Sequence, residues 1–267
     1  MVSGSGNGSV GLELRGLDLA YALPGGRVRA FEGVDAEIPG GSIAAIVGPS
    51  GCGKTSLIRV VAGLREPTGG EVIVEATAGA NERRPRMAVI FQDYGLLPWK
   101  TVSANVELPL LLAGLRAAER RARAAPIISE LGLGDFSRFF PGRLSGGMRQ
   151  RVALARALAQ DPEILLMDEP FSSLDALTRE SMQETLLELQ RRRGTTVFLV
   201  THSIEEAAYL ADRVYVMRGK NPGRIVGRLD APAPDDAGGS RPRVPSFRTE
   251  PGFLQYMNEI RRALEGS

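Results

Sequence analysis

The sequence has one cysteine, one histidine and one tryptophan among its 267 residues. A lone cysteine, Cys52, excludes an internal disulfide framework and fits a reducing compartment. The net charge of +2 disfavours a protein dedicated to binding nucleic acid. No apolar run approaches the roughly 18 residues that a membrane-spanning helix requires. Because the Gly/Ser-rich residues 1–10 also lack the basic and apolar segments of a signal peptide, we read them as a flexible tail and expect any membrane role to come through a partner.

What the sequence does contain is an alternation of short apolar runs and helical patterns. Runs typical of buried parallel strands lie at Ile43–Val47, Met87–Phe91, Glu163–Asp168 and Thr195–Thr201. Helices are predicted over about Lys54–Leu64 and Ala176–Arg192. Residues 102–159 are mostly helical in pattern, and Pro126 is expected to open a helix there. The pattern predicts an α/β core interrupted by a helical insert.

Both ends of the chain are predicted to add further elements. Other β-like runs lie at Leu12–Leu14, Leu17–Tyr21, Val34–Ile38, Glu71–Glu75, Arg213–Met217 and Arg224–Leu229. Ser203 and Glu206 form a capping-box pattern, in which the hydroxyl and the carboxylate satisfy free N–H groups where a helix begins. Residues 231–247, rich in Pro, Gly and charge, indicate a linker. Phe253–Leu264 is predicted to be a short amphipathic helix.

A phosphate-binding loop is the first chemical motif. "GPSGCGKTS" fits G-x-x-x-x-G-K-[ST] and lies between a predicted strand and a predicted helix, as that motif requires. The expected nucleotide-binding residues of the loop are Gly48, Pro49, Ser50, Gly51, Cys52, Gly53, Lys54, Thr55 and Ser56. Lys54 supplies charge at the β- and γ-phosphates, and the Thr55 hydroxyl is a ligand for Mg²⁺. Cys52 is interpreted as a small loop residue, since no base lies near it in the sequence.

A second motif, "EILLMDEP", places two carboxylates after a buried strand. In α/β sheets ligands bind at the carboxyl ends of the strands, where these side chains emerge. Asp168 is therefore predicted to hold Mg²⁺, directly or through water. Glu169 is predicted to polarise a water for attack on the γ-phosphorus. Alone this would be an ordinary acidic turn, but with the phosphate loop it indicates a nucleoside triphosphatase.

A third motif, "LSGGMRQR", resembles the signature of the ABC (ATP-binding cassette) ATPase family. Ser145 can cap the following helix, and two glycines let backbone N–H groups approach an anion. The resemblance covers roughly residues 12–230. It implies a P-loop NTPase (RecA-like) core with a mainly parallel sheet, an N-terminal antiparallel β part and an inserted α-helical subdomain. In that family two cassettes pair head to tail, so Ser145, Gly146 and Gly147 are expected to contact ATP held by the other subunit.

The resemblance also implies roles for residues outside these motifs. Tyr21 matches the aromatic residue that stacks on adenine, although a tyrosine packed in the core fits the sequence equally well. Gln92 matches the glutamine that reaches Mg²⁺ and the attacking water. Asp175 lies in "SSLD", which resembles the loop across the dimer interface, with Ser173 where the family commonly has Ala. His202 matches the switch histidine near the γ-phosphate; a structural histidine is the alternative.

The resemblance divides the chain into parts with distinct expected roles. Residues 11–93 and 157–230 are expected to form the nucleotide-binding core, and residues 94–156 the helical signature subdomain. Residues 231–267 form a C-terminal extension whose role the sequence leaves open.

Three classes of function compete. An unrelated P-loop kinase or GTPase leaves "LSGGMRQR" unexplained. A soluble ABC ATPase acting on nucleic acid or ribosomes usually has a long coiled coil or two cassettes, and the low net charge disfavours it. A transporter motor subunit fits a single cassette without a membrane segment.

The stretch "FQDYGLLPWKTVSANV" resembles the nitrate/sulfonate/taurine branch of ABC importers. The resemblance implies an ATPase at the cytoplasmic face of the membrane, working with permease subunits, a second cassette and, indirectly, an extracytoplasmic binding protein. The region Tyr94–Trp99 is expected to receive the permease, with Pro98 limiting the backbone. A core position for Trp99 is the alternative. The transported solute is not encoded in this chain.

Overall fold

A computed structural model describes residues 10–24, 26–75, 85–232 and 245–266. Residues 1–9 of the predicted tail (1–10) and most of the predicted linker, residues 233–244, lie outside these ranges. Val10, the last residue of that predicted tail, is buried and accepts a hydrogen bond from the Thr196 hydroxyl at 2.6 Å, so it belongs to the core. The elements begin with a three-stranded antiparallel sheet in the order β2-β1-β4. Its strands are β1 (Gly11–Leu23), β2 (Gly26–Ile38) and β4 (Gly69–Glu75). The N-terminal antiparallel part is therefore present as expected.

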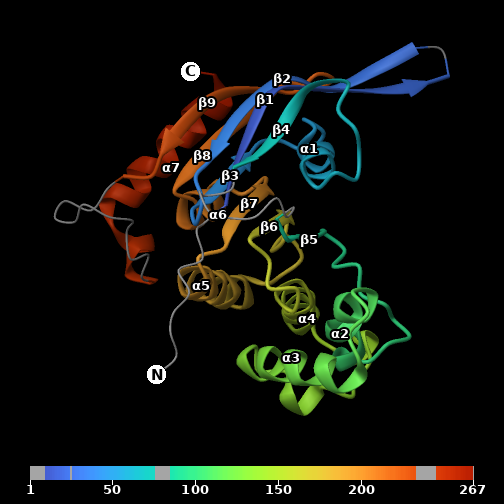
Figure 1. The fold of residues 1–267 in the computed structure, drawn as a ribbon. Coiled ribbons are helices and arrows are strands. Elements are labelled where there is room, and N and C mark those ends of the chain that lie inside the picture. The colour runs from blue at the N-terminus through green and yellow to red at the C-terminus, as the bar shows by residue number, and fades with distance from the viewer. Residues whose placement is uncertain (1–9, 25, 76–84, 233–244, 267) are drawn as a thin grey trace.

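The β1–β2 hairpin is longer than the sequence predicted. Two short runs, Leu12–Leu14 and Leu17–Tyr21, form one strand with shifts in register between them, where Gly16 adopts φ 53°. The second strand begins at Gly26 and not at Val34. Its first residues carry charge and exposed side chains, which hid the strand pattern. This part of the ribbon projects from the body of the protein (Figure 1).

A six-stranded sheet forms the centre of the molecule, in the order β5-β6-β7-β3-β8-β9. Its strands are β3 (Ile43–Val47), β5 (Met87–Ile90), β6 (Ile164–Asp168), β7 (Thr196–Thr201), β8 (Arg213–Arg218) and β9 (Arg224–Asp230). Only β9 pairs in the antiparallel direction. Every residue of β3, β6 and β7 is buried, as expected for a parallel sheet covered on both faces. The predicted P-loop NTPase fold is confirmed.

Alternate residues of the central strands belong to different hydrophobic cores. Ala44 and Ile46 of β3 pack with α1 (Lys54–Val61) and the antiparallel sheet. Ala45 and Val47 belong to the other core, which extends to the remaining helices. These helices are α2 (Val102–Leu112), α3 (Ala117–Glu130), α4 (Gly146–Leu158), α5 (Ala176–Arg193), α6 (Ile204–Leu210) and α7 (Pro251–Glu265). Figure 1 shows α2, α3 and α4 gathered at one end of the molecule. None of the described helices is long and apolar enough to cross a membrane.

Pro126 lies inside α3 and does not open it, so that prediction was wrong. A proline within a helix leaves the carbonyl group four residues earlier without its N–H partner. Here that carbonyl belongs to Ala122, which is exposed, so water can satisfy it. The Arg-rich segment before Pro126 is consequently helical and forms an exposed part of α3.

The C-terminal extension packs on the core. Its helix α7 buries Phe253, Tyr256 and Ile260, which recur on one face, against α6, β8 and β9. In the short turn before α7 (Pro245–Thr249), the Arg248 guanidinium lies 3.5 Å from the centre of the Tyr209 ring. Arg248 also donates hydrogen bonds to Glu205 and to Gln183. The extension is thereby attached to both α5 and α6.

Half of the predicted capping box at α6 is present. The Ser203 hydroxyl accepts a hydrogen bond from the Glu206 N–H at 3.2 Å. The second bond of the capping box, from the Ser203 N–H to the Glu206 carboxylate, is absent, because the Ser203 N–H donates to the Thr201 hydroxyl at 3.0 Å instead. The Glu206 side chain is instead only 4% exposed, and its Oε1 has no hydrogen-bond partner among the described residues. Burial raises the pKa of Glu206 to about 8, against the opposing effects of Thr201 and Arg179.

Replacing Glu206 by Gln is expected to stabilise the fold at alkaline pH. Between pH 4.5, the ordinary pKa of the side chain, and about pH 8, Glu206 keeps its proton in the folded state, whereas the unfolded chain has released it. The free energy of unfolding of the wild type therefore falls as pH rises through this window, by at most roughly 1.4 kcal/mol per pH unit. Urea unfolding at about pH 5.5 and about pH 8 should show the advantage of Glu206→Gln growing with pH. The exposed carboxylate change Glu180→Gln is the control; an advantage that does not depend on pH would contradict the assignment.

Candidate functional site

The glycine-rich loop joins β3 to α1 at the carboxyl end of the central sheet. Gly53 is the N-cap residue of α1 and has φ 102°. A Cβ atom at Gly53 would lie 2.7 Å from the Ala30 carbonyl oxygen, and one at Gly48 would overlap the Met217 carbonyl. Glycine at these positions lets the loop lie against both neighbouring segments. The loop and the N-terminus of α1 together offer backbone N–H groups to an anion.

Lys54 places a buried positive charge at this loop. Its ammonium group is 4% exposed and donates hydrogen bonds to the carbonyl oxygens of Gly48, at 2.8 Å, and Pro49, at 3.0 Å. It lies 3.5 Å from a carboxylate oxygen of Glu169. A desolvated cation held by neutral carbonyls and one carboxylate is well suited to binding a phosphate group.

Thr55 and Asp168 bring two oxygen ligands together from different elements. The Thr55 hydroxyl, on α1, donates to the Asp168 carboxylate, at the end of β6, at 3.1 Å. Burial raises the pKa of Asp168, while the bond from Thr55 and nearby cations lower it. A divalent cation would offset that desolvation, and hydroxyl and carboxylate oxygens are ligands that Mg²⁺ accepts. The donor set therefore fits the predicted metal.

Glu169 and His202 form a hydrogen-bonded pair that sequence reasoning did not anticipate. His202 Nδ1 lies 2.9 Å from Glu169 Oε2, and the two residues follow the adjacent strands β6 and β7. The Glu169 backbone is left-handed, with φ 46°, and its N–H donates to the Val200 carbonyl at 2.9 Å. This conformation is uncommon outside glycine and turns the carboxylate towards Lys54.

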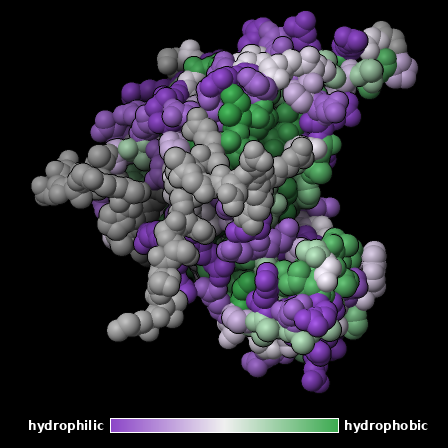
Figure 2. Space-filling view, in the orientation of Figure 1, coloured by the Kyte–Doolittle hydropathy of each residue, from purple (hydrophilic) through white to green (hydrophobic). Residues whose placement is uncertain are grey.

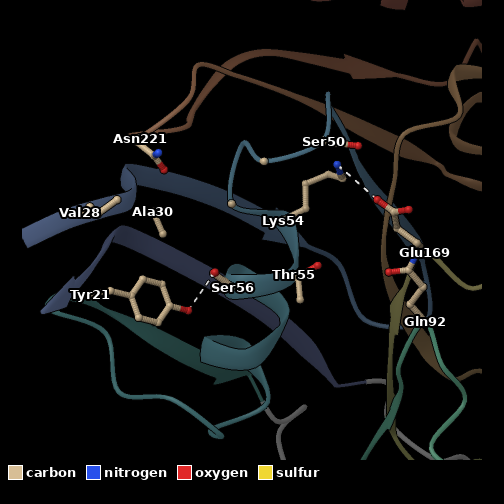
Figure 3. Close-up of a pocket in the computed structure, with 12 residues that line it drawn as sticks. Tyr21, Val28, Ala30, Ser50, Lys54, Thr55, Ser56, Gln92, Glu169 and Asn221 are labelled. Carbon is tan, nitrogen blue, oxygen red and sulfur yellow. Dashed lines mark hydrogen bonds and ion pairs between the residues drawn. The ribbon is translucent and has the colours of Figure 1, made fainter. Parts of the chain in front are cut away.

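Lys54, Thr55 and Glu169 line a pocket of about 400 Å³ (Figure 3), whereas Asp168 and His202 are not among its lining residues. It is lined by Tyr21, Val28, Ala30, Ser50, Gly51, Gly53, Lys54, Thr55, Ser56, Gln92, Glu169 and Asn221. The Tyr21 hydroxyl is hydrogen-bonded to Ser56 at 3.0 Å, and the Arg65 guanidinium lies 4.8 Å from the centre of the Tyr21 ring. Tyr21 therefore lines the pocket, and its half-buried side chain also packs against the core around α1.

Three lining residues were missed by sequence reasoning: Val28, Ala30 and Asn221. The first two belong to the part of β2 that was not predicted, and Asn221 lies in the turn between β8 and β9. Neither segment carries a motif. Cys52, although predicted at the site, is buried among core residues, and burial raises the pKa of its thiol. The thiol therefore has no catalytic environment.

The signature segment lies outside this pocket. Ser145 caps α4 as predicted, accepting a hydrogen bond from Met148 N at 3.3 Å. A Cβ atom at Gly147 would overlap the Thr178 methyl group, so glycine allows α4 to approach α5 closely. Asp175 caps α5 by accepting from Thr178 N at 3.0 Å, and its hydrogen bonds lower its pKa. None of Ser145, Gly146, Gly147 and Asp175 is among the lining residues of the pocket in their own chain.

The segment after β5 separates into a buried and an exposed part. Gln92 lines the pocket. Tyr94 is buried, and its hydroxyl is hydrogen-bonded to Ser173 at 2.7 Å, so it is not part of an exposed surface. The Arg156 guanidinium donates to the carbonyl oxygens of Tyr94 and Gly95, both at 2.6 Å. Trp99 is 70% exposed, so the alternative of a core tryptophan is wrong.

Comparison with known proteins agrees with this arrangement. A family model described as "ABC transporter" matches residues 31–172. An uncharacterised ABC transporter ATP-binding protein of Methanocaldococcus jannaschii is 42% identical over 258 residues, covering 96% of this chain and 92% of the relative. A nitrate import ATP-binding protein of Synechocystis is 40% identical over 255 residues, 96% and 95% of the two chains. A taurine import ATP-binding protein of Yersinia pestis is 45% identical over 200 residues, 75% and 78% of the two chains.

Solved structures give the same result. A bacterial ABC transporter cassette solved as a dimer matches with a TM-score of 0.72 and 32% identity, over 83% of this chain and 99% of the other. The same values hold for a post-hydrolysis dimeric state bound to ADP and phosphate. With its phosphate loop, paired carboxylates and signature segment in place, this chain belongs to the ABC transporter family and is one of its ATP-hydrolysing cassettes.

Proposed function

We propose that this cassette is the motor subunit of an importer for a small solute, of the kind that carries nitrate, sulfonates, taurine or a vitamin precursor. The nitrate and taurine import proteins among its relatives support this choice of substrate class. The pairing of two cassettes is supported by the division of the site: the pocket holds Lys54 and Glu169 but not the signature of the same chain. A second cassette, most simply another copy, would supply Ser145, Gly146 and Gly147. The comparisons give no support to the alternative of an ATPase acting on nucleic acid or ribosomes.

Within the closed site each residue has a proposed role. Lys54 and the loop N–H groups bind the phosphates, and the backbone at the signature glycines of the partner cassette completes the cage. Thr55, Gln92 and Asp168 would hold Mg²⁺, which would supply positive charge to the phosphate oxygens. Glu169 accepts a proton from the attacking water, and His202 orients the carboxylate through the 2.9 Å contact. Tyr21 stacks on the adenine, and Asp175 lies at the interface between the cassettes.

We also propose a role for each segment of the chain. We assign residues 11–93 and 157–230 to the nucleotide-binding core, 94–156 to the helical subdomain and 231–267 to the extension. The cassette would act at the cytoplasmic face of the membrane, with an extracytoplasmic binding protein contacting the permease and not this chain. The test is co-purification with the membrane subunit, followed by ATPase assays with candidate ligand-loaded binding proteins. Stimulation by one ligand identifies the solute, whereas association with ribosomes or DNA would overturn the proposal.

The segment Leu96–Trp99, in which Pro98 and Trp99 are exposed and the two leucines are half-buried, is the proposed docking site for the permease. Figure 2 shows hydrophobic surface near α2, the helix that this segment precedes. The segment is held firmly by the side-chain amide of Asn105. This amide accepts a hydrogen bond from the Leu97 N–H at 2.8 Å and donates one to the Leu97 carbonyl at 3.1 Å. An apolar surface on a firm backbone is typical of an interface.

Replacing Trp99 by Ala is expected to uncouple ATP hydrolysis from transport. Loss of an aromatic anchor from an interface typically costs roughly 2 kcal/mol or more of binding free energy. The affinity of the isolated subunit for ATP should be retained, while assembly with the permease and solute uptake in proteoliposomes should fall. Leu254→Ala, at an exposed position on α7, is the control. Loss of folding in Trp99→Ala, or normal uptake, would argue against docking at this site.

A further inference from the structure

The two ends of the nucleotide pocket carry different chemistry. In Figure 3, Lys54 and Glu169 lie at one end, while Tyr21, Val28 and Asn221 surround the other. A triphosphate bound at Lys54 leaves the nucleoside at the second end. That end holds the Tyr21 ring, small or aliphatic side chains and one carboxamide.

The turn that carries Asn221 is fixed against the body of the site. The Gly223 N–H donates to the Ala30 carbonyl at 3.0 Å, and the Glu32 N–H donates to the Gly223 carbonyl at 3.0 Å. Gly223 packs so closely on the phosphate loop that a Cβ atom would overlap the Cys52 carbonyl group. The β8–β9 turn therefore keeps a set position relative to both the phosphate loop and β2.

Asn221 itself has hydrogen-bonding groups to offer. Asn221 is exposed, and its side chain makes no hydrogen bond to another residue that the structure describes. Its φ of 53° lies in the left-handed region, where asparagine is common in turns, so the backbone alone could explain the residue type. A turn role does not require the residue to line a pocket, however, and Asn221 does. The carboxamide carries both donors and an acceptor.

We propose that the Asn221 carboxamide hydrogen-bonds the nucleoside part of ATP, either an edge of the adenine or a ribose hydroxyl. The proposal deepens the proposed function, because it assumes that the triphosphate lies at Lys54. Amides pair well with adenine, which presents adjacent donor and acceptor atoms, and with hydroxyl groups, which both donate and accept. The turn between β8 and β9 thus forms a third wall of the site, beside the phosphate loop and the antiparallel sheet.

The test is Asn221→Gly, which removes the side chain and keeps the left-handed backbone without strain. One neutral hydrogen bond corresponds to an affinity for ATP that is about 2- to 12-fold weaker. Titration calorimetry on the full chain would compare ATP, GTP, 2′-deoxy-ATP and inorganic triphosphate. Inorganic triphosphate should bind as in the wild type. A loss for ATP and 2′-deoxy-ATP but not for GTP assigns the contact to the base; a loss for ATP and GTP but not for 2′-deoxy-ATP assigns it to the ribose.

The controls separate this inference from the proposal on which it rests. Asp161→Gly relieves another left-handed residue, with φ 49°, in the turn before the amino end of β6, whereas the pocket lies at the carboxyl ends of the strands; this variant should leave ATP affinity unchanged. Unchanged ATP affinity in Asn221→Gly would overturn the assignment, as would an equal loss for inorganic triphosphate, which would indicate a disturbed phosphate loop. Failure of the wild type to bind ATP would instead reject the nucleotide site as a whole.

Discussion

Glu169→Gln is expected to bind ATP and to hydrolyse it about 10²–10⁴-fold more slowly than the wild type, the range that a general base contributes. Glutamine has nearly the same shape as glutamate and can keep the contact with His202, but its amide does not accept a proton from water. The phosphate-binding groups, Lys54 and the loop, are unchanged. The variant should therefore form a stable ATP-bound dimer, because the step that releases the partner is blocked.

Phosphate release and size-exclusion chromatography with ATP and Mg²⁺ would measure turnover and dimerisation. Glu259→Gln, an exposed carboxylate change on α7, is the matched control and should behave as the wild type. Normal turnover in Glu169→Gln would reject the base assignment. Slow turnover without an ATP-dependent dimer would reject the account of closure.

Ser145→Arg is expected to retain ATP binding and lose closure. Ser145 lies outside the pocket of its own chain, so a bulky cation there leaves nucleotide binding intact. In a head-to-tail dimer the same side chain would enter the partner's site and remove backbone and hydroxyl donors from the phosphate. Loss of such donors lowers turnover by about 10²–10³-fold.

Two further variants separate closure from helix stability. Ser145→Ala removes only the cap of α4, a loss of about 1 kcal/mol in stability, without the bulk. Ser246→Arg adds the same cation at an exposed serine of the C-terminal extension. Turnover in Ser145→Arg equal to that of Ser246→Arg would contradict a contact between subunits. ATP affinity is measured on the same samples, because its loss would place the signature in the pocket of its own chain.

The parts of the site that the sequence predicts are those built from consecutive residues. The phosphate loop is one example, because a strand, a glycine-rich loop and a helix that follow one another leave few ways to place Lys54 and Thr55. The carboxyl end of β6 is another, since a continuous apolar run predicts a buried strand that ends at Asp168 and Glu169. Both depend on local geometry that the residue pattern encodes.

The parts that escaped prediction depend on contacts between distant segments. Asn221 reaches the pocket because Gly223 packs on Cys52, a contact across 171 positions that no local pattern records. Glu206 matched a capping motif but was buried, because the fold places α6 against α7 and the central sheet. Pro126 was tolerated because Ala122 faces solvent, which is a property of the assembled protein.

The attachment of the C-terminal extension has a consequence for how the chain can be shortened. The inner face of α7 shares a hydrophobic core with α6, and Arg248 covers the ring of Tyr209, seven residues after His202. A deletion at residue 231 would therefore uncover apolar surface beside the helix that follows His202. The boundary between core and extension is a division in sequence only: mechanically, the end of the chain belongs to the body that holds the active site.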